Sequence, residues 1–327
     1  MVGSSPRLVV VTGARGFLGG HVVRALEQRG FPVRAVGREH GDLRSAESAE
    51  RLVHGAATVV HLAADVGGVG YLRDCPGRAF HDNFAMGLNI IRAALHAGVG
   101  RLVLAGTPCS YASDVPLPLS EESLFEGVPS GDTGTYGYAK LATSLAAAAF
   151  CRGLPTDSVT VIPSNLYGPG DSFDESHGHV VAALIRKAVL AAELGQETFE
   201  VWGDGSATRD FVYVTDVARG IAAVVAEPGR FEGATFNLGS GRETSIREIA
   251  SVVAAAAGRG VRPHFRADKP VGYARRVMSV AQAADLLDYA AATEPVDGIR
   301  RTIDWLRAKG LIARWAAAAG AAVRRAA

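Results

Sequence analysis

A tyrosine and a lysine four positions apart are the first residues in this chain that could do chemistry. Tyr136 and Lys140 stand in the segment YGYAK, and residues four apart share one face of a helix. A lysine ammonium beside a phenol favours the phenolate, so Tyr136 could exchange a proton with a substrate hydroxyl near neutral pH. Tyr138 is two positions from Lys140 and is expected on a different face. Upstream, the hydroxyl of Thr107 could donate a hydrogen bond to the oxygen that is oxidised or reduced.

Three glycines near the N-terminus mark a second candidate site. They form the pattern GxxGxxG directly after an apolar run and before a helical one. In order, such glycines permit a tight turn, a close approach of the backbone to a pyrophosphate, and close packing of helix on strand. The helix N-terminus adds free N–H groups for the phosphates. Glycines also serve in ordinary turns, but this context favours a dinucleotide site. Its candidate residues are Gly13, Arg15, Gly16, Phe17, Leu18 and Gly19.

The end of the second predicted strand bears on which dinucleotide binds. An NAD site usually carries an acidic residue there, on the ribose 2′-hydroxyl. Residues 35–38 read AVGR, with no acid. Arg38, together with Arg15, could form a charge-assisted fork to a 2′-phosphate, which favours NADP over NAD. The alternative is that Arg38 is a solvated surface charge. Asp42 stands where it could contact adenine or serve only as a turn acid.

Strand-like and helix-like segments alternate through the first half of the chain. Residues 8–11 are a short apolar run, typical of a strand buried on both faces. Alternation of this kind predicts crossover units and a parallel sheet, and hence an α/β fold of the doubly wound, Rossmann type. The expected strands are 8–11, 33–36, 59–62, 101–105 and 158–162, and the expected helices are 17–29, 83–96 and 136–150.

The second half of the chain predicts a smaller C-terminal lobe, partly interleaved with the first domain. We expect a helix over 180–194, strands over 209–214 and 235–238, and a helix capped by Thr215. Ser245 and Glu248 form a capping box before a further apolar helix. The expected boundaries are 1–164 for the dinucleotide-binding domain, 165–315 for the lobe and 316–327 for an Ala-rich tail.

Composition excludes several classes of function. The chain has 327 residues, of which 20% are charged, and its net charge of +1 lacks the basic excess of nucleic-acid-binding proteins. Apolar runs fall short of the ~20 residues that a membrane helix needs, and no secretory leader is evident. Three widely spaced cysteines without a CxxC pair indicate neither a disulfide framework nor a metal site. We therefore expect a cytoplasmic protein with no nucleic-acid or membrane partner and no bound metal.

Several segments together resemble the extended short-chain dehydrogenase/reductase family, also described as NAD-dependent epimerases/dehydratases. The resemblance runs from Val9 to about Trp305. It rests on TGARGFLG, HLAA, Asn83, YGYAK, SNLYGPG, RDFVYVTDVARG and NLGSG. It implies a Rossmann domain, a C-terminal nucleotide-sugar lobe and a homodimer, the last by analogy alone. The further cofactor contacts that it implies are Asp42, Leu43, Ala63, Ala64, Asn83 and Lys140.

Within that family the chain is most similar to the branches that epimerise GDP-sugars, the GDP-L-fucose synthases and GDP-mannose 3,5-epimerases. The segments HLAADVGGVGYL, TPCSY and HVVAALIRK carry this similarity. It implies that Cys109 and His179 work from opposite sides of a 4-keto sugar. Their ordinary pKa values, about 8.5 and about 6.5, suit proton exchange near neutrality. The alternatives are a buried apolar cysteine and a surface histidine, and His177 is a rival to His179.

The same similarity implies the residues that bind the nucleotide sugar. Arginine and lysine suit a diphosphate, and tryptophan offers an apolar face. Ordinary surface or core roles are the alternatives. These candidate residues are Lys187, Trp202 and Arg209, and Asn165 is expected to contact the nicotinamide or the sugar. Two departures from the pattern put the particular sugar in doubt: Thr107 stands where serine is usual, and Val271 stands where an acid is common.

These features favour epimerisation of a nucleotide sugar, GDP-linked by resemblance, at carbon 3, carbon 5 or both through a 4-keto intermediate. Carbon 4 would then be reduced with NADPH or restored by a retained cofactor. A simple 4-epimerase or 4-reductase is the alternative, and it would need Tyr136, Lys140 and Thr107 but neither Cys109 nor His179. A silent dinucleotide-binding regulator is a third hypothesis, against which the retained YxxxK pattern argues.

Overall fold

The computed structural model describes residues 7–174, 178–269 and 271–326. The chain divides into two compact units, each assembled from three stretches of sequence. Unit 1 consists of Met1–Ser164, Thr215–Gly239 and Met278–Ala290. Unit 2 consists of Asn165–Val214, Ser240–Val277 and Ala291–Ala327. Helix α11 (Leu311–Ala326) of unit 2 runs across residue 316, where the sequence suggests that a separate tail begins.

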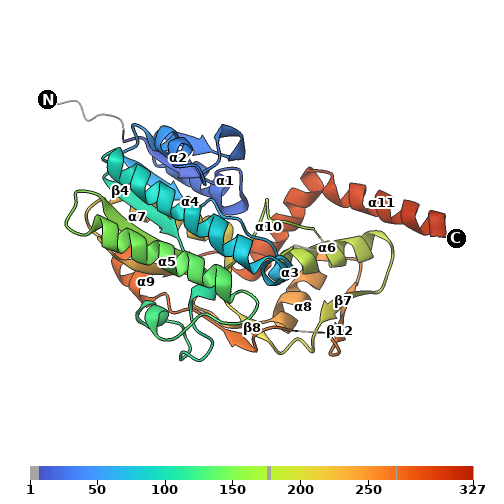
Figure 1. The fold of residues 1–327 in the computed structure, drawn as a ribbon. Helices are drawn as coiled ribbons and strands as arrows, with labels where there is room; N and C mark the ends of the chain where they lie inside the picture. Colours follow the sequence, from blue (N-terminus) through green and yellow to red (C-terminus); the bar gives the residue numbers. More distant parts are fainter. Residues whose placement is uncertain (1–6, 175–177, 270, 327) are drawn as a thin grey trace. The chain divides into compact units, whose positions relative to one another are not determined.

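A six-stranded parallel sheet, of which Figure 1 labels β4, forms the centre of unit 1. The strand order is β10-β5-β4-β3-β1-β2. Every neighbouring pair is parallel, so the predicted Rossmann-type doubly wound fold is confirmed. Chain order reverses at β1, because β2 and β3 lie on its two sides. Ligands of such sheets bind beyond the carboxyl ends of the strands at this point. The strands are β1 (Val9–Thr12), β2 (Val33–Val36), β3 (Thr58–His61), β4 (Arg101–Ala105), β5 (Asp157–Pro163) and β10 (Thr235–Leu238).

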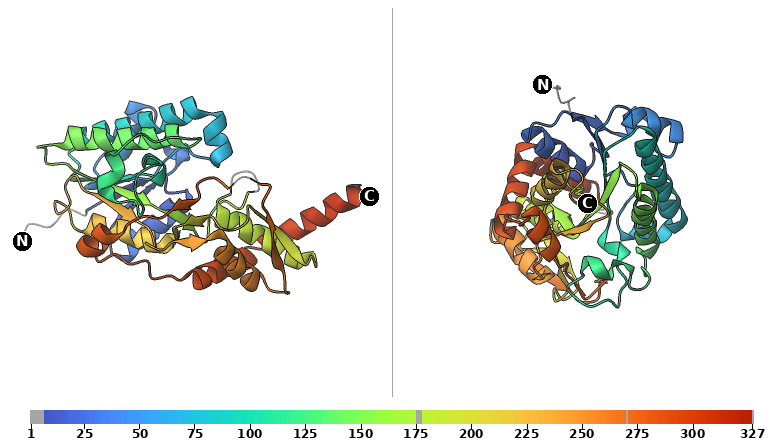
Figure 2. Two further views of the ribbon diagram at one scale, coloured as in Figure 1. Left: turned by 90° about the horizontal axis from the view of Figure 1, so that it is seen from below. Right: turned by 90° about the vertical axis from the view of Figure 1, so that its left-hand side faces the viewer.

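Helices cover both faces of this sheet because its strands are apolar on both sides. Val10 and Val59 pack in one core cluster with residues of α2 (Ala46–Val53) and α4 (Pro76–His96). Neighbouring Val9, Val11 and Val60 are equally buried and point to the opposite face. Helices α4 and α5 (Gly134–Cys151) lie side by side on one face (Figure 2). The remaining helices of unit 1 are α1 (Phe17–Gln28), α3 (Val69–Asp74), α7 (Val214–Ala226) and α9 (Ala281–Leu287), with short 3-10 turns η1 (Arg38–His40), η2 (Pro108–Ser110) and η3 (Glu121–Phe125).

Unit 2 packs its helices around an apolar core and carries short pairs of strands at its edge. The core includes Val181 and Ile185 of α6 (Val180–Glu193) and Ile249 of α8 (Ile246–Ala257). The other elements are α10 (Pro295–Ala308), β6 (Asn165–Tyr167) paired with β9 (Phe211–Tyr213), β7 (Thr198–Trp202) paired with β12 (Arg262–Arg266), and β8 (Thr208–Arg209) between β11 (Thr244–Ser245) and β13 (Arg275–Arg276).

Most predicted elements of the first half are confirmed within a few residues. In the second half, two predictions were wrong. The single strand expected over 209–214 is divided at Asp210 into β8 and β9. The buried Asp210 carboxylate accepts hydrogen bonds from Ser240, and its carbonyl accepts one from the Asn165 N–H, which diverts the chain there. Helix α7 starts at Val214, so Thr215 lies inside its first turn and is not its cap.

Two details of helix starts differ in how well sequence located them. The helix expected from residue 83 begins earlier, at Pro76, because proline suits the first helical position. The sequence prediction started later, since residues 76–82 show no apolar periodicity. The predicted capping box is confirmed: the Ser245 hydroxyl accepts from the Glu248 N–H at 3.1 Å, and the Glu248 carboxylate accepts from the Ser245 N–H at 2.7 Å. Over the described ranges, the structure contains no helix whose length and apolar character would let it span a bilayer.

Candidate active site

The glycine-rich loop joins β1 to α1, and two of its glycines have no room for a side chain. A Cβ on Gly13, whose φ is +69°, would lie 2.6 Å from the Ala63 nitrogen. A Cβ on Gly19 would lie 2.1 Å from the Gly13 carbonyl oxygen. Gly16 is the N-cap of α1 and has no side chain to cap the helix, so no N-cap side chain occupies the first N–H groups. This cradle fits a dinucleotide pyrophosphate.

Two arginines at the end of β2 differ in their partners. Arg15 donates from Nε to Oε1 of Glu39 at 2.8 Å, and both side chains are exposed. Glu39 follows the strand end by three residues, and the sequence analysis did not consider it. Arg38 is exposed and forms no ion pair within the described part of the chain. Arg38 is therefore the guanidinium that stays available for a 2′-phosphate, whereas Arg15 is already neutralised.

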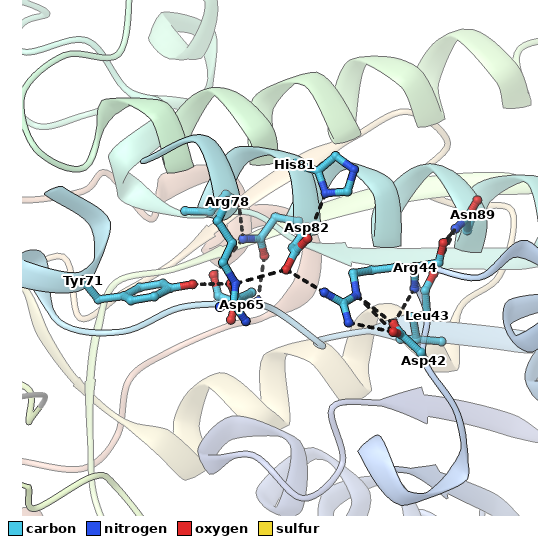
Figure 3. A network of polar contacts seen from close by, with 11 residues as sticks. Asp42, Leu43, Arg44, Asp65, Tyr71, Arg78, His81, Asp82 and Asn89 are labelled. Carbon is cyan, nitrogen blue, oxygen red and sulfur yellow. Dashed lines mark hydrogen bonds and ion pairs between the residues drawn. The ribbon is translucent and has the colours of Figure 1, made fainter. Parts of the chain in front are cut away.

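Asp42 belongs to a polar network that α4 organises (Figure 3). Its carboxylate accepts from the Arg44 N–H at 2.9 Å and pairs with the Arg44 guanidinium at 2.7 Å, which is the turn role that the sequence left open. Arg44 also donates to Asp82 of α4 at 3.0 Å. Leu43 is buried, and its carbonyl accepts from Asn89 of α4 at 3.0 Å. Helix α4 thus holds the segment that follows β2.

The same helix holds the segment that follows β3. Asn83 is 3% exposed and donates from its amide nitrogen to the carbonyl oxygens of Asp65 and Ala79, both at 2.7 Å, while its amide oxygen accepts from the Asp65 N–H at 3.0 Å. The Tyr71 hydroxyl donates to the Asp65 carboxylate, and this bond raises the pKa of Tyr71 to about 12 (Figure 3). Asn83 therefore fixes the backbone next to Ala63 and Ala64, and would influence a cofactor through that backbone.

Tyr136 and Lys140 lie on α5, both buried in unit 1. Burial raises the pKa of Tyr136, and the charge of Cys109 acts in the same direction. Burial lowers the pKa of Lys140 to about 8. The Lys140 ammonium makes no hydrogen bond or ion pair with another described residue. In the protein alone, then, burial outweighs the effect of lysine on the phenol that the YxxxK spacing suggests, and each group is pushed towards its neutral form.

His61 at the end of β3 is a buried titratable group that the sequence analysis treated only as part of a motif. It is 1% exposed, and its Nδ1 lies 2.8 Å from the Thr12 hydroxyl. Burial, with a smaller contribution from the charge of Lys140, lowers the pKa of His61 to about 3. His61 is therefore neutral at physiological pH and braces the ends of β1 and β3 against each other.

Thr107, Cys109 and Tyr136 are brought together at the start of α5. The Thr107 hydroxyl accepts from the Cys109 N–H at 3.3 Å, which leaves its own proton free to donate to a ligand. Cys109 and Tyr136 share one small apolar cluster with Leu72. A Cβ on Gly137 would lie 2.1 Å from the Cys109 carbonyl oxygen, so the glycine lets α5 approach this turn. Sequence reasoning missed Gly137, although it lies inside YGYAK.

His179 of unit 2 stands at the N-cap of α6 and is paired with a carboxylate. Its Nδ1 lies 2.8 Å from Oδ1 of Asp171, and its side chain is 63% exposed, whereas that of Asp171 is 1% exposed. The hydrogen bond to Asp171 raises the pKa of His179 against the opposing effect of burial. The rival His177 lies outside the described residues. Asp171 was missed because it lies eight positions before His179 in the sequence, and no periodic pattern links the two residues.

Lys187 and Trp202, two of the predicted substrate contacts, lie against each other in unit 2. The Lys187 ammonium lies 5.5 Å from the centre of the Trp202 ring and donates to the Glu200 carbonyl at 3.3 Å. The Trp202 side chain is exposed. A Cβ on Gly203 would lie 2.2 Å from a Val271 methyl carbon, so Val271 packs against the residue that follows Trp202.

Arg209 and Asn165 occupy neighbouring places in the same unit. Arg209 donates to the Val271 carbonyl at 3.2 Å, and burial lowers the pKa of Arg209, assisted by the charge of Arg276. Asn165 is exposed and donates from its side chain to the Asp210 carbonyl at 3.1 Å. Arg209 therefore contacts the Val271 backbone, and the Val271 side chain packs at Gly203, while the Asn165 side chain is partly occupied by the backbone.

Comparison with known proteins defines the class. The chain belongs to the NAD dependent epimerase/dehydratase family, whose model matches residues 9–239. This membership confirms the resemblance found in the sequence and the prediction of an NAD(P)-dependent enzyme.

Individual relatives narrow the comparison. The chain is 32% identical to GDP-L-fucose synthase 1 of Arabidopsis thaliana over 306 residues, which cover 91% of this chain and 92% of that protein. It is 30% identical to dTDP-4-dehydro-6-deoxy-D-allose reductase of a Streptomyces species, over 92% of this chain and 96% of that protein. It also matches the solved structure of a GDP-L-fucose synthetase from Naegleria fowleri bound to NADP, with a TM-score of 0.83 and 26% identity over 93% of each chain.

Proposed function

We propose that this chain is a GDP-sugar epimerase–reductase that inverts a 4-keto hexose at carbon 3, carbon 5 or both and then reduces carbon 4 with NADPH. The observation that carries the proposal is the packing of turn η2 against the start of α5, which brings Thr107 and Cys109 close to Tyr136. It combines a group suited to proton exchange at carbon with groups suited to a reacting oxygen. The GDP-L-fucose synthase relatives support the choice of a GDP-linked sugar.

NADP is the proposed cofactor. Gly13, Gly16 and Gly19 would hold its pyrophosphate at the start of α1, and the exposed Arg38 would meet its 2′-phosphate. When bound in its reduced form, NADPH supplies the hydride for carbon 4. Ala63 and Ala64 follow the carboxyl end of β3, where dinucleotides bind in such folds, and are proposed as cofactor contacts. Lys140 of α5 is proposed as a further contact.

The epimerisation steps need two groups that exchange protons with carbon. A carbonyl at carbon 4 acidifies the protons at carbons 3 and 5. One of Cys109 and His179 removes such a proton and leaves an enolate, and the other returns a proton from the opposite face of the ring. Both act at the same oxidation level, so the net change is inversion alone. Thiolate and imidazole can each be restored by solvent between turnovers.

The reduction step uses Tyr136 and its neighbours. As carbon 4 gains hydride, its oxygen needs a proton, and the buried Tyr136 phenol is protonated and able to donate one. Lys140, with a pKa of about 8, can return a proton to the phenolate near neutral pH. Thr107 donates a hydrogen bond to the same oxygen. In unit 2, Lys187 and Arg209 would bind the diphosphate, with Trp202 and Asn165 as the further contacts.

Mass spectrometry in deuterium oxide tests the proposal. With GDP-4-keto-6-deoxymannose and NADPH, we expect NADPH oxidation together with deuterium at carbons 3 and 5 of the product. With GDP-mannose and no added cofactor we expect neither. Mass gain in GDP-mannose without added cofactor would mean an epimerase that retains its dinucleotide. Silence with both substrates, in protein that binds NADPH, would contradict a GDP-hexose substrate.

A second candidate function is a simple 4-reductase or 4-epimerase of another nucleotide sugar. The 30% identity to a dTDP-sugar reductase over nearly the whole chain favours it. This activity needs Tyr136, Lys140 and Thr107 but not Cys109 or His179. A Cys109→Ser variant that keeps full activity on the natural substrate would support this second candidate over the first.

We also infer a cytoplasmic homodimer. Helices α4 and α5, which pack against each other, expose the large apolar side chains of Phe80, Leu145 and Phe150, and exposed apolar groups are suited to protein contacts. Cys75, Cys109 and Cys151 are all free thiols, as is usual in a reducing compartment. Light scattering at micromolar concentration tests the dimer: the mass of one chain for the wild type would contradict it, and a Leu145→Glu variant should be monomeric.

A further inference from the structure

A buried carboxylate lies directly behind the exposed imidazole of His179. The Asp171 side chain is 1% exposed, and its Oδ1 accepts from the Ser172 N–H at 2.7 Å and contacts Nδ1 of His179 at 2.8 Å. Its other oxygen, Oδ2, is buried and forms no hydrogen bond within the described residues. A buried carboxylate with an unsatisfied oxygen gains strongly from a neighbouring cation. Protonated His179 is that cation.

The local backbone holds the two side chains in register. His179 is the N-cap of α6, and its carbonyl accepts from the Ala183 N–H at 2.9 Å. The Gly178 N–H donates to the Asp174 carbonyl at 2.9 Å, and a Cβ on Gly178 would lie 2.6 Å from that same oxygen. Only glycine fits this close approach. Gly178 therefore constrains the backbone immediately before His179.

The helix start makes the carboxylate necessary. The positive end of the α6 dipole disfavours a cation at its N-cap, and so does the partial desolvation of the ring, although 63% of the side chain is exposed. Asp171 is the group that opposes both, because its hydrogen bond raises the pKa of His179. The other charged groups near this helix are engaged elsewhere: Arg186 donates to the Phe173 carbonyl at 2.8 Å, and Lys187 lies over Trp202.

We propose that Asp171 is the positioning residue of this enzyme: it holds Nδ1 of His179, orients the ring, and leaves Nε2 as the nitrogen that exchanges a proton with the sugar carbon. A carboxylate bonded to one ring nitrogen fixes the tautomer in which that nitrogen carries hydrogen, so the other can act as a base. After proton abstraction, the imidazolium is stabilised by the buried charge of Asp171. The pairing of Asp171 with His179 does not depend on the proposed function. The assignment of the transferred proton to a sugar carbon rests on the proposed epimerisation.

Proton NMR titration of the histidines tests the coupling without any substrate. The nine histidines give separate C–H signals, and the one lost in a His179→Asn variant identifies His179. In the wild type we expect His179 to titrate above the ordinary value of a free imidazole. In Asp171→Asn its pKa should fall, whereas Asp174→Asn, which removes an exposed acid of the same turn, should leave it unchanged. An ordinary or depressed pKa of His179 in the wild type would overturn the inference, even if the variants failed to fold.

Exchange kinetics then show whether the pair acts in catalysis. Asp171→Asn should slow deuterium incorporation at carbon 3 or 5 of the keto-sugar by roughly 10–100-fold, and the acidic limb of its pH profile, which reports deprotonation of the base His179, should shift with the NMR value. NADPH affinity should stay unchanged, and Asp171→Asn combined with His179→Asn should be no slower than His179→Asn alone. Unchanged exchange in a folded Asp171→Asn protein would overturn the positioning role. Absence of exchange in the wild type would instead count against the proposed function, and the titration would still decide the coupling.

Discussion

Tyr136 and Lys140 in unit 1 and His179 in unit 2 are tuned by opposite physical means. The first two are buried among apolar groups, and burial pushes each towards its neutral form. His179 has an exposed ring whose charged form is favoured by a hydrogen bond to a buried carboxylate. A buried phenol suits the delivery of a proton to an oxygen in one direction. An exposed histidine with a fixed tautomer suits a proton that must come and go at carbon.

The largest effect should come from the phenol of Tyr136. Tyr136→Phe removes the proton that the reduced oxygen needs, so NADPH oxidation with the keto-sugar should fall by about 10³-fold. Stopped-flow absorbance of NADPH measures it. Tyr138→Phe is the matched control, since Tyr138 lies two positions away with an exposed side chain, and it should keep full activity. Equal losses in both variants would contradict the assignment.

Cys109 sharpens the comparison because it lies beside Tyr136 in unit 1 but is proposed to exchange a proton with carbon. Cys109→Ser should slow deuterium incorporation into the keto-sugar by at least about 10²-fold, since a serine hydroxyl is a far weaker base than a thiol. Cys151→Ser, which changes a buried thiol in the same unit, should leave exchange unchanged. If Cys109→Ser turns over normally with deuterium at both carbons, the thiol is not the proton donor.

Lys140 provides a test of burial by stability. Its pKa in the folded protein is about 8, below its ordinary value of 10.5. Folding therefore costs up to about 3 kcal/mol at pH values below 8, where the folded protein must keep a buried ammonium protonated. Between pH 8 and 10.5 the unfolded chain binds more protons, so Lys140 makes stability rise with pH across this window.

Urea unfolding of a Lys140→Met variant measures this cost. We expect the variant to be more stable than the wild type at pH 7 by about 1–3 kcal/mol, and the difference to shrink as the pH approaches 10.5. Its catalytic activity should be lost. A less stable variant at pH 7 would show that the ammonium has a stabilising partner. It would contradict the statement that burial alone sets the pKa of Lys140 in unit 1.

The smallest effect concerns the choice between the two dinucleotides. Arg38→Ser should raise the KM for NADPH by about tenfold while leaving the KM for NADH nearly unchanged, because one charge-assisted contact to the 2′-phosphate is lost. Arg15→Ser should have a weaker effect, since Glu39 already pairs with Arg15. Steady-state kinetics with both cofactors separates these outcomes. A larger effect for Arg15 than for Arg38 would reverse the assignment.

Local sequence patterns predicted the strands of the sheet and the glycine-rich cofactor loop. They did not predict the polar residues that contact the proton-transfer groups. The strands over 33–36, 101–105 and 235–238 were located to the residue, because apolar runs between glycines leave little freedom of register. The division of the strand at Asp210 could not be foreseen, since a buried carboxylate that binds distant N–H groups gives no periodic signal. Asp171 was missed for the same reason.

Glycine positions show the same limit. The spacing of Gly13, Gly16 and Gly19 is a recognised pattern that predicts close backbone contacts. Two of these glycines, Gly13 and Gly19, indeed have no room for a Cβ. Gly137 sits inside a motif defined by its first and last residues, so its contact with the Cys109 backbone appears only in three dimensions. Glu39, which neutralises Arg15, lies three positions past the end of β2, so no acid stands at the strand end itself where the NAD pattern places one.

The central claim is that proton exchange at carbon and proton delivery to oxygen are performed by separate groups. The most direct test is the Tyr136→Phe variant with GDP-4-keto-6-deoxymannose in deuterium oxide, monitored by mass spectrometry together with NADPH absorbance. The account predicts that deuterium still enters carbon 3 or 5 of the keto-sugar at close to the wild-type rate while NADPH oxidation stops. Loss of exchange together with reduction, in a variant that folds and binds NADPH, would contradict it.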